Sequence, residues 1–168
     1  MYAAKQANRG TVYAYEPHPE NFELLQENVR LNGLHNVRTH QYGVLDGRKD
    51  IKLYVDELNN AGHSIYNKAE RALTVPCVSL ASIFDDNDLE FCDLLKMDCE
   101  GAEYDILFAL PTVYFGRIGA VAMEYHDGMY KKKTVEDLIR LFEDNNFAVR
   151  LPDPGASQGL LYAKNKKV

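Results

Sequence analysis

The sequence predicts an α/β domain in which a mostly parallel β-sheet lies between helices in three layers and is closed by a C-terminal antiparallel hairpin. Three observations predict this class. Segments with strand character alternate with segments of helical spacing along most of the chain. The runs 91–97 and 118–123 are almost wholly apolar, which is typical of strands covered on both faces. The last two strand candidates, 147–151 and 159–163, are joined by a loop of hairpin length.

Length and composition predict one ordinary acidic domain over residues 1–168. The chain is 46% hydrophobic and carries a formal charge of -6, so it can build a core and is not suited to grip nucleic acid. Its three cysteines are odd in number and lack C-x-x-C spacing, which favours neither disulfides nor zinc. There is no apolar stretch of about 20 residues and no signal pattern. We therefore expect a soluble cytoplasmic protein that binds neither nucleic acid nor membrane.

The first strand and helix are marked by proline and glycine. Residues 11–15 alternate β-branched and aromatic side chains, and the turn at Glu16 and Pro17 ends that strand. Pro19 suits a first helical turn, and Asn32-Gly33 is a good C-terminal cap. The spacing predicts a helix of about 13 residues between them.

The middle of the chain predicts a β excursion before the central strand. Short extended segments are expected within 36–42, at 50–55 and at 73–78, with a polar loop at 59–70. Ser79 can then cap a short helix.

Two helices are expected in the second half. Residues 100–110 begin with acidic side chains and end before Pro111. Residues 134–137 resemble a capping box, and a stripe at i, i+3, i+4 and i+7 follows it: Val135, Leu138, Ile139 and Phe142.

Polar side chains stand where the predicted strands end, and ligands of such sheets lie outside the carboxyl ends of the strands. These residues are Glu16, the Gly43 region, Asp98 with Glu100, and Glu124 with His126. Glu16 can accept both hydroxyls of a ribose, although a solvated turn residue explains it equally well.

Asp98 is the strongest functional candidate on chemical grounds. It ends a run expected to be buried, and a buried carboxylate needs partners or a task. For Glu100 and Glu103, in contrast, the helix dipole is a sufficient explanation.

Glu124 and His126 are two apart on a strand, so they point to the same side. A histidine oriented by a nearby carboxylate can take a proton from a hydroxyl, whereas a loop hydrogen bond is the simpler role for it. With Asp98 the pair would also make a two-carboxylate, one-histidine metal site, but nothing in the spacing requires a metal and we predict none.

The remaining histidines are expected at surface or structural positions. Residues 131–133, a lysine run, are expected to form a solvated turn, and the alternative is that they attract an anionic substrate.

Three segments in order resemble the FkbM family of methyltransferases. They are Val12-Tyr-Ala-Tyr-Glu-Pro-His-Pro-Glu-Asn-Phe22, Asp93-Leu-Leu-Lys-Met-Asp-Cys-Glu-Gly-Ala-Glu103 and Met123-Glu-Tyr-His126. The middle segment is similar to the D-x-x-K-x-D-x-E-G-x-E core of that family. The resemblance runs from about Met1 to Ala163.

The resemblance implies a class I, Rossmann-like methyltransferase fold, S-adenosylmethionine as cofactor, and O-methylation of a hydroxyl on a sugar or secondary metabolite. Carried over by position, Glu16, with Pro17 beside it, would hold the cofactor ribose. Gly43 and Val44 would border the adenine. Asp98 would lie near the methionine end of the cofactor, and Glu124 and His126 would face a small hydroxylated acceptor, which makes Asp98, Glu124 and His126 the expected catalytic residues.

The sequence departs from the family pattern at its start. Family members begin with a strand and a D-x-G-A-N-x-G-type loop, neither of which is found here, so we expect weakened cofactor binding and a gap at the sheet centre. The neighbouring strands would close up, another chain would lend a strand, or the chain derives from a longer parent. Ala81 replaces a usual Asp, and Gly43 replaces a usual Ala, the latter expected to be harmless.

Two alternatives to an active methyltransferase remain. One is a catalytically impaired module that associates with proteins, including copies of itself, through exposed strand edges. The other is a different nucleotide-binding enzyme, which the lack of G-x-G-x-x-G disfavours.

Overall fold

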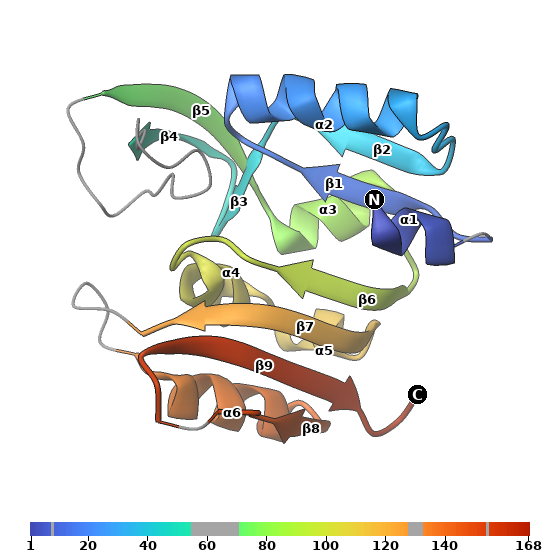
Figure 1. The fold of residues 1–168 in the computed structure, drawn as a ribbon. Helices are drawn as coiled ribbons and strands as arrows, with labels where there is room; N and C mark the ends of the chain where they lie inside the picture. The colour runs from blue at the N-terminus through green and yellow to red at the C-terminus, as the bar shows by residue number, and fades with distance from the viewer. Residues whose placement is uncertain (8, 55–70, 128–132, 154) are drawn as a thin grey trace.

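A computed structural model describes the chain except for residues 8, 55–70, 128–132 and 154 (Figure 1). The expected polar loop at 59–70 lies outside the described residues, as do Lys131 and Lys132. The strands are β1 (Val12–Tyr15), β2 (Val37–His40), β3 (Gly43–Leu45), β4 (Lys49–Tyr54), β5 (Ala72–Ser79), β6 (Cys92–Met97), β7 (Ile118–His126), β8 (Phe147–Arg150) and β9 (Gln158–Asn165). The helices are α1 (Tyr2–Gln6), α2 (Pro19–Leu31), α3 (Leu80–Asp86), α4 (Glu103–Ala109), α5 (Thr112–Phe115) and α6 (Val135–Asp144).

The α/β class is confirmed, and the described strands form three separate sheets. β1 pairs with β2 in parallel, β3 and β4 flank β5, and the third sheet has the order β6-β7-β9-β8. β6 and β7 are parallel, whereas the β8-β9 pair is the antiparallel hairpin predicted at the C-terminus. β1, β2, β6 and β7 point the same way in Figure 1, so their carboxyl ends lie on one side of the molecule.

A space between β1 and β6 separates the first sheet from the third. β1 is hydrogen-bonded only to β2, β6 only to β7, and no strand in the described part of the chain pairs with their other edges. The two neighbours have therefore not closed up, which was one of the outcomes expected for this sheet.

The core lies between the third sheet and the helices α3 to α6. Phe142 is fully buried, with its ring centroid 5.5 Å from that of Phe147 and 6.3 Å from that of Phe115. In Figure 1, α4 and α5 lie behind β6 and β7. The first and last of these helices are held by their predicted caps: Ser79 accepts the N–H of Ser82, and Thr134 forms the capping box at the start of α6.

The other face of this sheet is open in the described structure. Alternate residues of β9 are buried and exposed, and Leu160 and Tyr162 are on the exposed side. Leu94 of β6 is 54% exposed. The expectation that β6 is covered on both faces is therefore wrong for this strand, because an apolar run alone does not tell a strand covered once from one covered twice.

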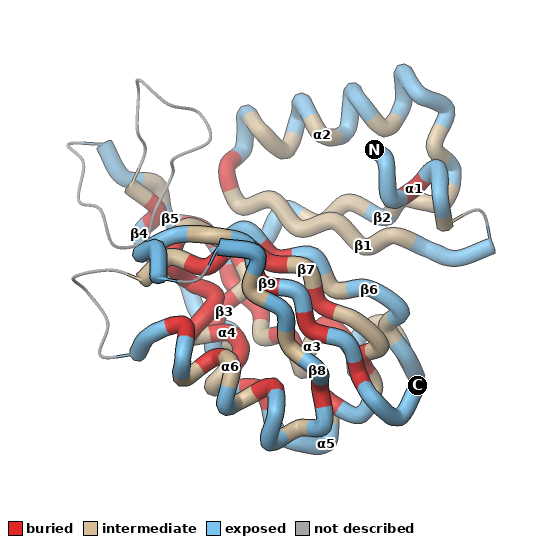
Figure 2. The backbone as a smooth tube through the Cα atoms, turned by 60° about the horizontal axis from the view of Figure 1, so that its bottom comes forward, coloured by how far each residue is buried: buried red, intermediate tan, exposed pale blue. Residues whose placement is uncertain are grey.

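Helix α2 has the predicted bounds but buries no residue (Figure 2). Its N-cap is His18, Pro19 begins it, and Leu24 and Leu31 remain exposed. α1 is tied to this region by Asn36, whose amide donates to the carbonyls of Ala4 and Ala7.

Helix α4 begins later than the sequence predicts, at Glu103 rather than at residue 100. Glu100 and Gly101 have φ angles of 49° and 98°, so the chain turns sharply through the left-handed region before the helix starts.

The short helix α5 was not predicted. No helix among the described residues has the length and apolarity that crossing a membrane requires.

Candidate active site

A cavity of about 500 Å³ lies at the carboxyl ends of β1 and β6 and is lined by the whole of β3. All five residues that the sequence predicts for cofactor binding line it: Glu16, Pro17, Gly43, Val44 and Asp98. The other lining residues are Tyr15, Asn21, Tyr42, Leu45, Ile51, Leu53, Cys77, Cys99, Glu100 and Ala102. The structure thus brings segments from five parts of the chain to one cavity, including β4, which the sequence did not implicate.

The walls of this cavity differ in character. Leu45, Ile51 and Leu53 supply an apolar side, whereas Glu16, Asp98 and Glu100 supply carboxylates. None of the described lining residues is a lysine, arginine or histidine. The cavity therefore favours a ligand that is partly apolar and carries positive charge over one that carries phosphates.

Glu16 is positioned by the strand end and the proline that follows it. Its Oε1 accepts the backbone N–H of His18 at 2.8 Å, which fixes the carboxylate at the rim of the cavity. The N–H of Glu16 donates to the carbonyl of His40 at 3.1 Å, so the end of β1 is held to β2. Tyr15 stacks on His40 with ring centroids 4.7 Å apart. His40 therefore has the structural role expected of it.

Gly43 has a packing role that the sequence did not reveal. A Cβ at this position would lie 2.6 Å from Sγ of Cys77, its register partner on β5. The glycine makes room for the thiol, and the expectation that glycine in place of the usual alanine is harmless stays a prediction.

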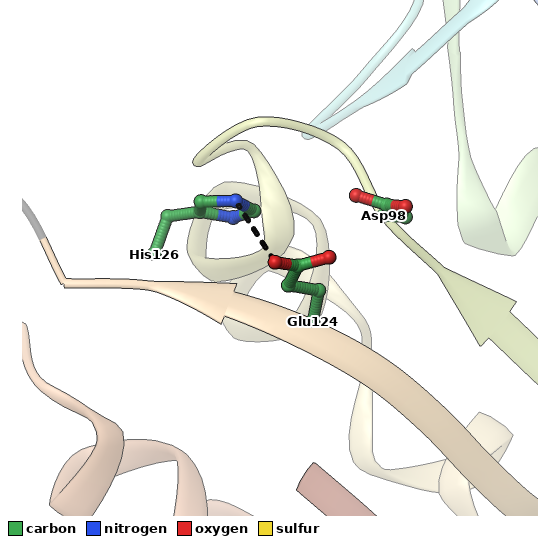
Figure 3. Close-up of side chains that lie close together, drawn as sticks. All are labelled: Asp98, Glu124 and His126. Carbon is green, nitrogen blue, oxygen red and sulfur yellow. Dashed lines mark ion pairs between the residues drawn. The ribbon is translucent and has the colours of Figure 1, made fainter. Parts of the chain in front are cut away.

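Asp98, Glu124 and His126 lie together beside the cavity, and one ligand atom from each falls within 4.8 Å of the others. Figure 3 shows Glu124 and His126 rising from the same side of β7 and Asp98 at the end of β6. Lys96 Nζ is 3.5 Å from a carboxylate oxygen of Asp98, and the Asp98 side chain is 42% exposed, so the expectation that this carboxylate is buried is wrong. Gln158 donates to Glu124 at 2.7 Å. Their predicted convergence is found, and their catalytic roles stay predictions.

Carboxylates surround the imidazole of His126. Oε2 of Glu100 lies 3.8 Å from Nε2 and Oε1 of Glu124 lies 4.0 Å from it, while Oε1 of Glu103 lies 3.4 Å from Nδ1. The contact with Glu103 is the largest reason why the pKa of His126 is raised above its ordinary value, and burial opposes this rise. Burial in turn raises the pKa of Glu100.

Glu103 is the site residue that sequence reasoning missed. Its side chain is fully buried, and Oε1 accepts the backbone N–H of Cys99 at 2.7 Å. The sequence placed it on a helix start, where the dipole explains an acidic residue without further function. Its only signal was its place in the strand-to-helix turn that begins at Asp98, where it is the first residue of α4.

The cluster of Asp98, Glu124 and His126 offers donors of the kind that bind divalent cations. The sequence expectation that this site requires no metal stays a prediction. Lys133, the described member of the lysine run, lies with its Nζ 3.6 Å from the ring centroid of Phe108.

Fold and site define a Rossmann-like domain with a ligand cavity at its strand ends, and comparisons with known proteins identify the family. The sequence model of the methyltransferase FkbM domain matches residues 1–149, so the chain belongs to the FkbM methyltransferase family. Methyltransferase FkbM from Methylobacillus flagellatus has a similar fold, with a TM-score of 0.61 and 15% identity over 92% of this chain and 36% of that one. A precorrin-6y C5,15-methyltransferase from Geobacter metallireducens has a TM-score of 0.52 and 12% identity over 97% of this chain and 72% of that one.

Two curated relatives are similar in sequence. Methyltransferase 1 of Beauveria bassiana is 27% identical over 177 residues, which cover 92% of this chain and 69% of the relative. Hexuronic acid methyltransferase AglP of Haloferax volcanii is 24% identical over 154 residues, which cover 85% of this chain and 62% of the relative. The chain thus spans less than two thirds of the second relative.

Proposed function

We propose that this chain is a methyltransferase domain that binds S-adenosylmethionine in the cavity and directs methyl transfer to the oxygen of a small hydroxylated acceptor. One observation carries the proposal. The cavity presents carboxylates from Glu16, Asp98 and Glu100, an apolar side, and no cationic side chain among its described lining residues. S-adenosylmethionine is a nucleoside that carries a sulfonium, an ammonium and a carboxylate, so its net positive charge complements these walls.

The residues present fit such a cofactor. Glu16 at the end of β1 would accept the ribose hydroxyls, and Val44 with Leu45 would pack against the adenine. Asp98 would face the positively charged methionine end. When bound, the cofactor supplies a methyl group on a sulfonium centre, which an oxygen nucleophile can take in line.

The acceptor would bind near His126, which lies beside Asp98 and Glu100 of the cavity wall. Proton transfer from the acceptor hydroxyl to a positioned imidazole contributes roughly 10²–10⁴-fold to a rate. Because Asp98, Glu100 and Glu124 all face this place, an acceptor without negative charge is favoured over a uronic acid. A neutral sugar or hydroxylated metabolite is the class of acceptor proposed.

Calorimetric titration with S-adenosylmethionine tests the cofactor part of the proposal. We expect saturable binding that weakens by at least tenfold in Glu16→Ala and is unchanged in Glu20→Ala, an exposed glutamate outside the cavity. Absence of binding in the wild-type protein at millimolar cofactor would contradict the proposal.

The acceptor class is tested by comparing methyl transfer to a neutral hexose and to its uronic acid. A higher kcat/KM for the neutral sugar is expected. If Glu124→Gln raises kcat/KM for the uronic acid more than for the hexose, the charge of the site sets this preference. A higher kcat/KM of the wild-type protein for the uronic acid would refute the proposed neutral acceptor class.

The free edges of β1 and β6 favour a second candidate function, association through strand pairing. Both edges belong to parallel strands and face the same space, and each offers backbone donors and acceptors that no described strand uses. A second copy of the chain would pair there. Sedimentation over a range of concentrations distinguishes the two: a monomer that binds the cofactor argues for the enzyme alone.

A further inference from the structure

The three carboxylates that form ion pairs with His126 are not equivalent, because only one of them faces Nδ1. Glu100 and Glu124 approach Nε2 at 3.8 and 4.0 Å, and their side chains are 39% and 32% exposed. Glu103 approaches Nδ1 at 3.4 Å, and its side chain is 0% exposed. The carboxylate at Nδ1 is therefore fully buried, whereas the two at Nε2 are partly exposed and one of them, Glu100, lines the cavity. Both ring nitrogens are themselves buried.

We propose that Glu103 is a positioning residue that holds neutral His126 with its proton on Nδ1 and so leaves Nε2 as the proton acceptor for the substrate hydroxyl. The inference rests on the proposed function for what the histidine does. What Glu103 does to the histidine is a separate property of the folded chain.

Glu103 is anchored well enough for such a role. Its Oε1 accepts the N–H of Cys99 at 2.7 Å, and its Oε2 is buried with no hydrogen-bond partner among the described residues. A buried carboxylate with unused acceptor capacity is costly unless a donor is supplied. Nδ1 of His126 lies 3.4 Å from Oε1 of the same carboxylate, so its N–H is a donor within reach of this group.

At 3.4 Å, the contact between Nδ1 and Oε1 is long, and it does not have the geometry of a hydrogen bond. Contacts of catalytic groups commonly tighten only when the substrate is bound. A small rotation of the imidazole about its bond to Cβ would bring Nδ1–H onto the carboxylate and leave Nε2 toward the cavity.

In the proposed transfer, the acceptor oxygen would form a bond to the methyl carbon, the carbon–sulfur bond would break with its electron pair passing to sulfur, and the hydroxyl proton would move to Nε2 of His126. Glu103 stabilises the imidazolium that results. Because Nε2 is buried, the proton would leave through Glu100, whose carboxylate lies 3.8 Å from Nε2 and is partly exposed to solvent.

The tautomer of His126 is measured directly by NMR on protein labelled with nitrogen-15 in its histidines, without cofactor or acceptor. The two ring nitrogens give distinct signals, and solution imidazole prefers the proton on Nε2, so an Nδ1–H tautomer is diagnostic. We expect Nδ1–H in the neutral wild-type ring. An Nε2–H tautomer in the wild type would overturn the inference, whatever any variant does.

Glu103→Gln is the informative variant because its amide keeps the shape and keeps an oxygen for the N–H of Cys99. Its NH2 group would donate to Nδ1 and drive the proton to Nε2, which is the wrong tautomer for a base. We expect the tautomer to switch, the pKa of His126 to fall, and kcat to fall by roughly 10²-fold or more with little change in KM.

Glu100→Gln is the matched control. It removes a charge at a similar distance from the opposite ring nitrogen, so the Nδ1–H tautomer should persist. If both variants keep Nδ1–H, Glu103 does not select the tautomer and the inference fails. If the tautomer is as expected but S-adenosylmethionine does not bind, the proposed function fails while the positioning role stands.

Discussion

Gly43 and Cys77 are register partners on the parallel strands β3 and β5, and the thiol of Cys77 fills the space that a side chain at position 43 would need. The pair lines the cavity and also belongs to its packed wall. The side chain that each of the two positions can hold therefore depends on the other position, and the sequence of either strand alone does not reveal this.

Gly43→Ala should destabilise the protein by about 1–3 kcal/mol, because the new Cβ overlaps Sγ of Cys77. The double variant with Cys77→Ala should recover much of that loss, and urea denaturation of all four proteins measures the coupling. Gly47→Ala is the control, since nothing lies within 4 Å of its Cβ position. Strict additivity of the two changes would show that the overlap relaxes without cost.

The rate of methyl transfer should rise with pH as His126 loses its proton. The pKa of this residue is raised above 6.5, chiefly by Glu103, so the midpoint of the kcat profile should lie above that value. Glu103→Gln should move the midpoint of the residual activity downward. A profile that falls as pH rises through this range would exclude His126 as the base.

The three thiols should react slowly in the folded protein. Burial raises the pKa of Cys77, Cys92 and Cys99, and for Cys99 burial together with the charge of Glu103 raises it to about 12. Thiolate is the reactive form. Titration with a disulfide reagent near pH 8 should find almost no fast thiol before denaturation and three after it, and rapid labelling of Cys99 would show that its surroundings open.

Phe142→Ala should cost about 3–5 kcal/mol of stability, because the ring is fully buried against Phe115 and Phe147. Leu31→Ala on α2 is the comparison, since Leu31 is 65% exposed and its loss should change stability by less than about 0.5 kcal/mol. Chemical denaturation measures both. Equal effects would mean that α2 is covered in solution by something absent from this fold.

Local sequence patterns predicted the helices well where a cap and an apolar stripe coincide. Pro19 and Asn32 bracket α2, and the Thr134 capping box begins α6, because both signals depend only on neighbouring residues. The start of α4 was predicted too early. Glu100 and Gly101 adopt left-handed φ angles before the helix begins, and no local sequence pattern predicted this turn.

The candidate site was predicted in part. Strand ends gave Glu16, Asp98, Glu124 and His126 because the carboxyl ends of parallel strands meet on one side. The role of Glu103 was hidden because its burial and its contact with His126 depend on how α4 packs against β7, which no local pattern encodes. The contribution of β4 to the cavity depends on sheet pairing at long range in the same way.

Mapping of S-adenosylmethionine onto the protein by NMR tests the central claim most directly. Titration of the cofactor should shift the backbone amide signals of Glu16, Val44 and Cys99 together, while those of Asp144 and Val149, far along the chain in α6 and β8, stay unchanged. Shifts confined to residues outside the cavity, or none at saturating cofactor, would contradict the account.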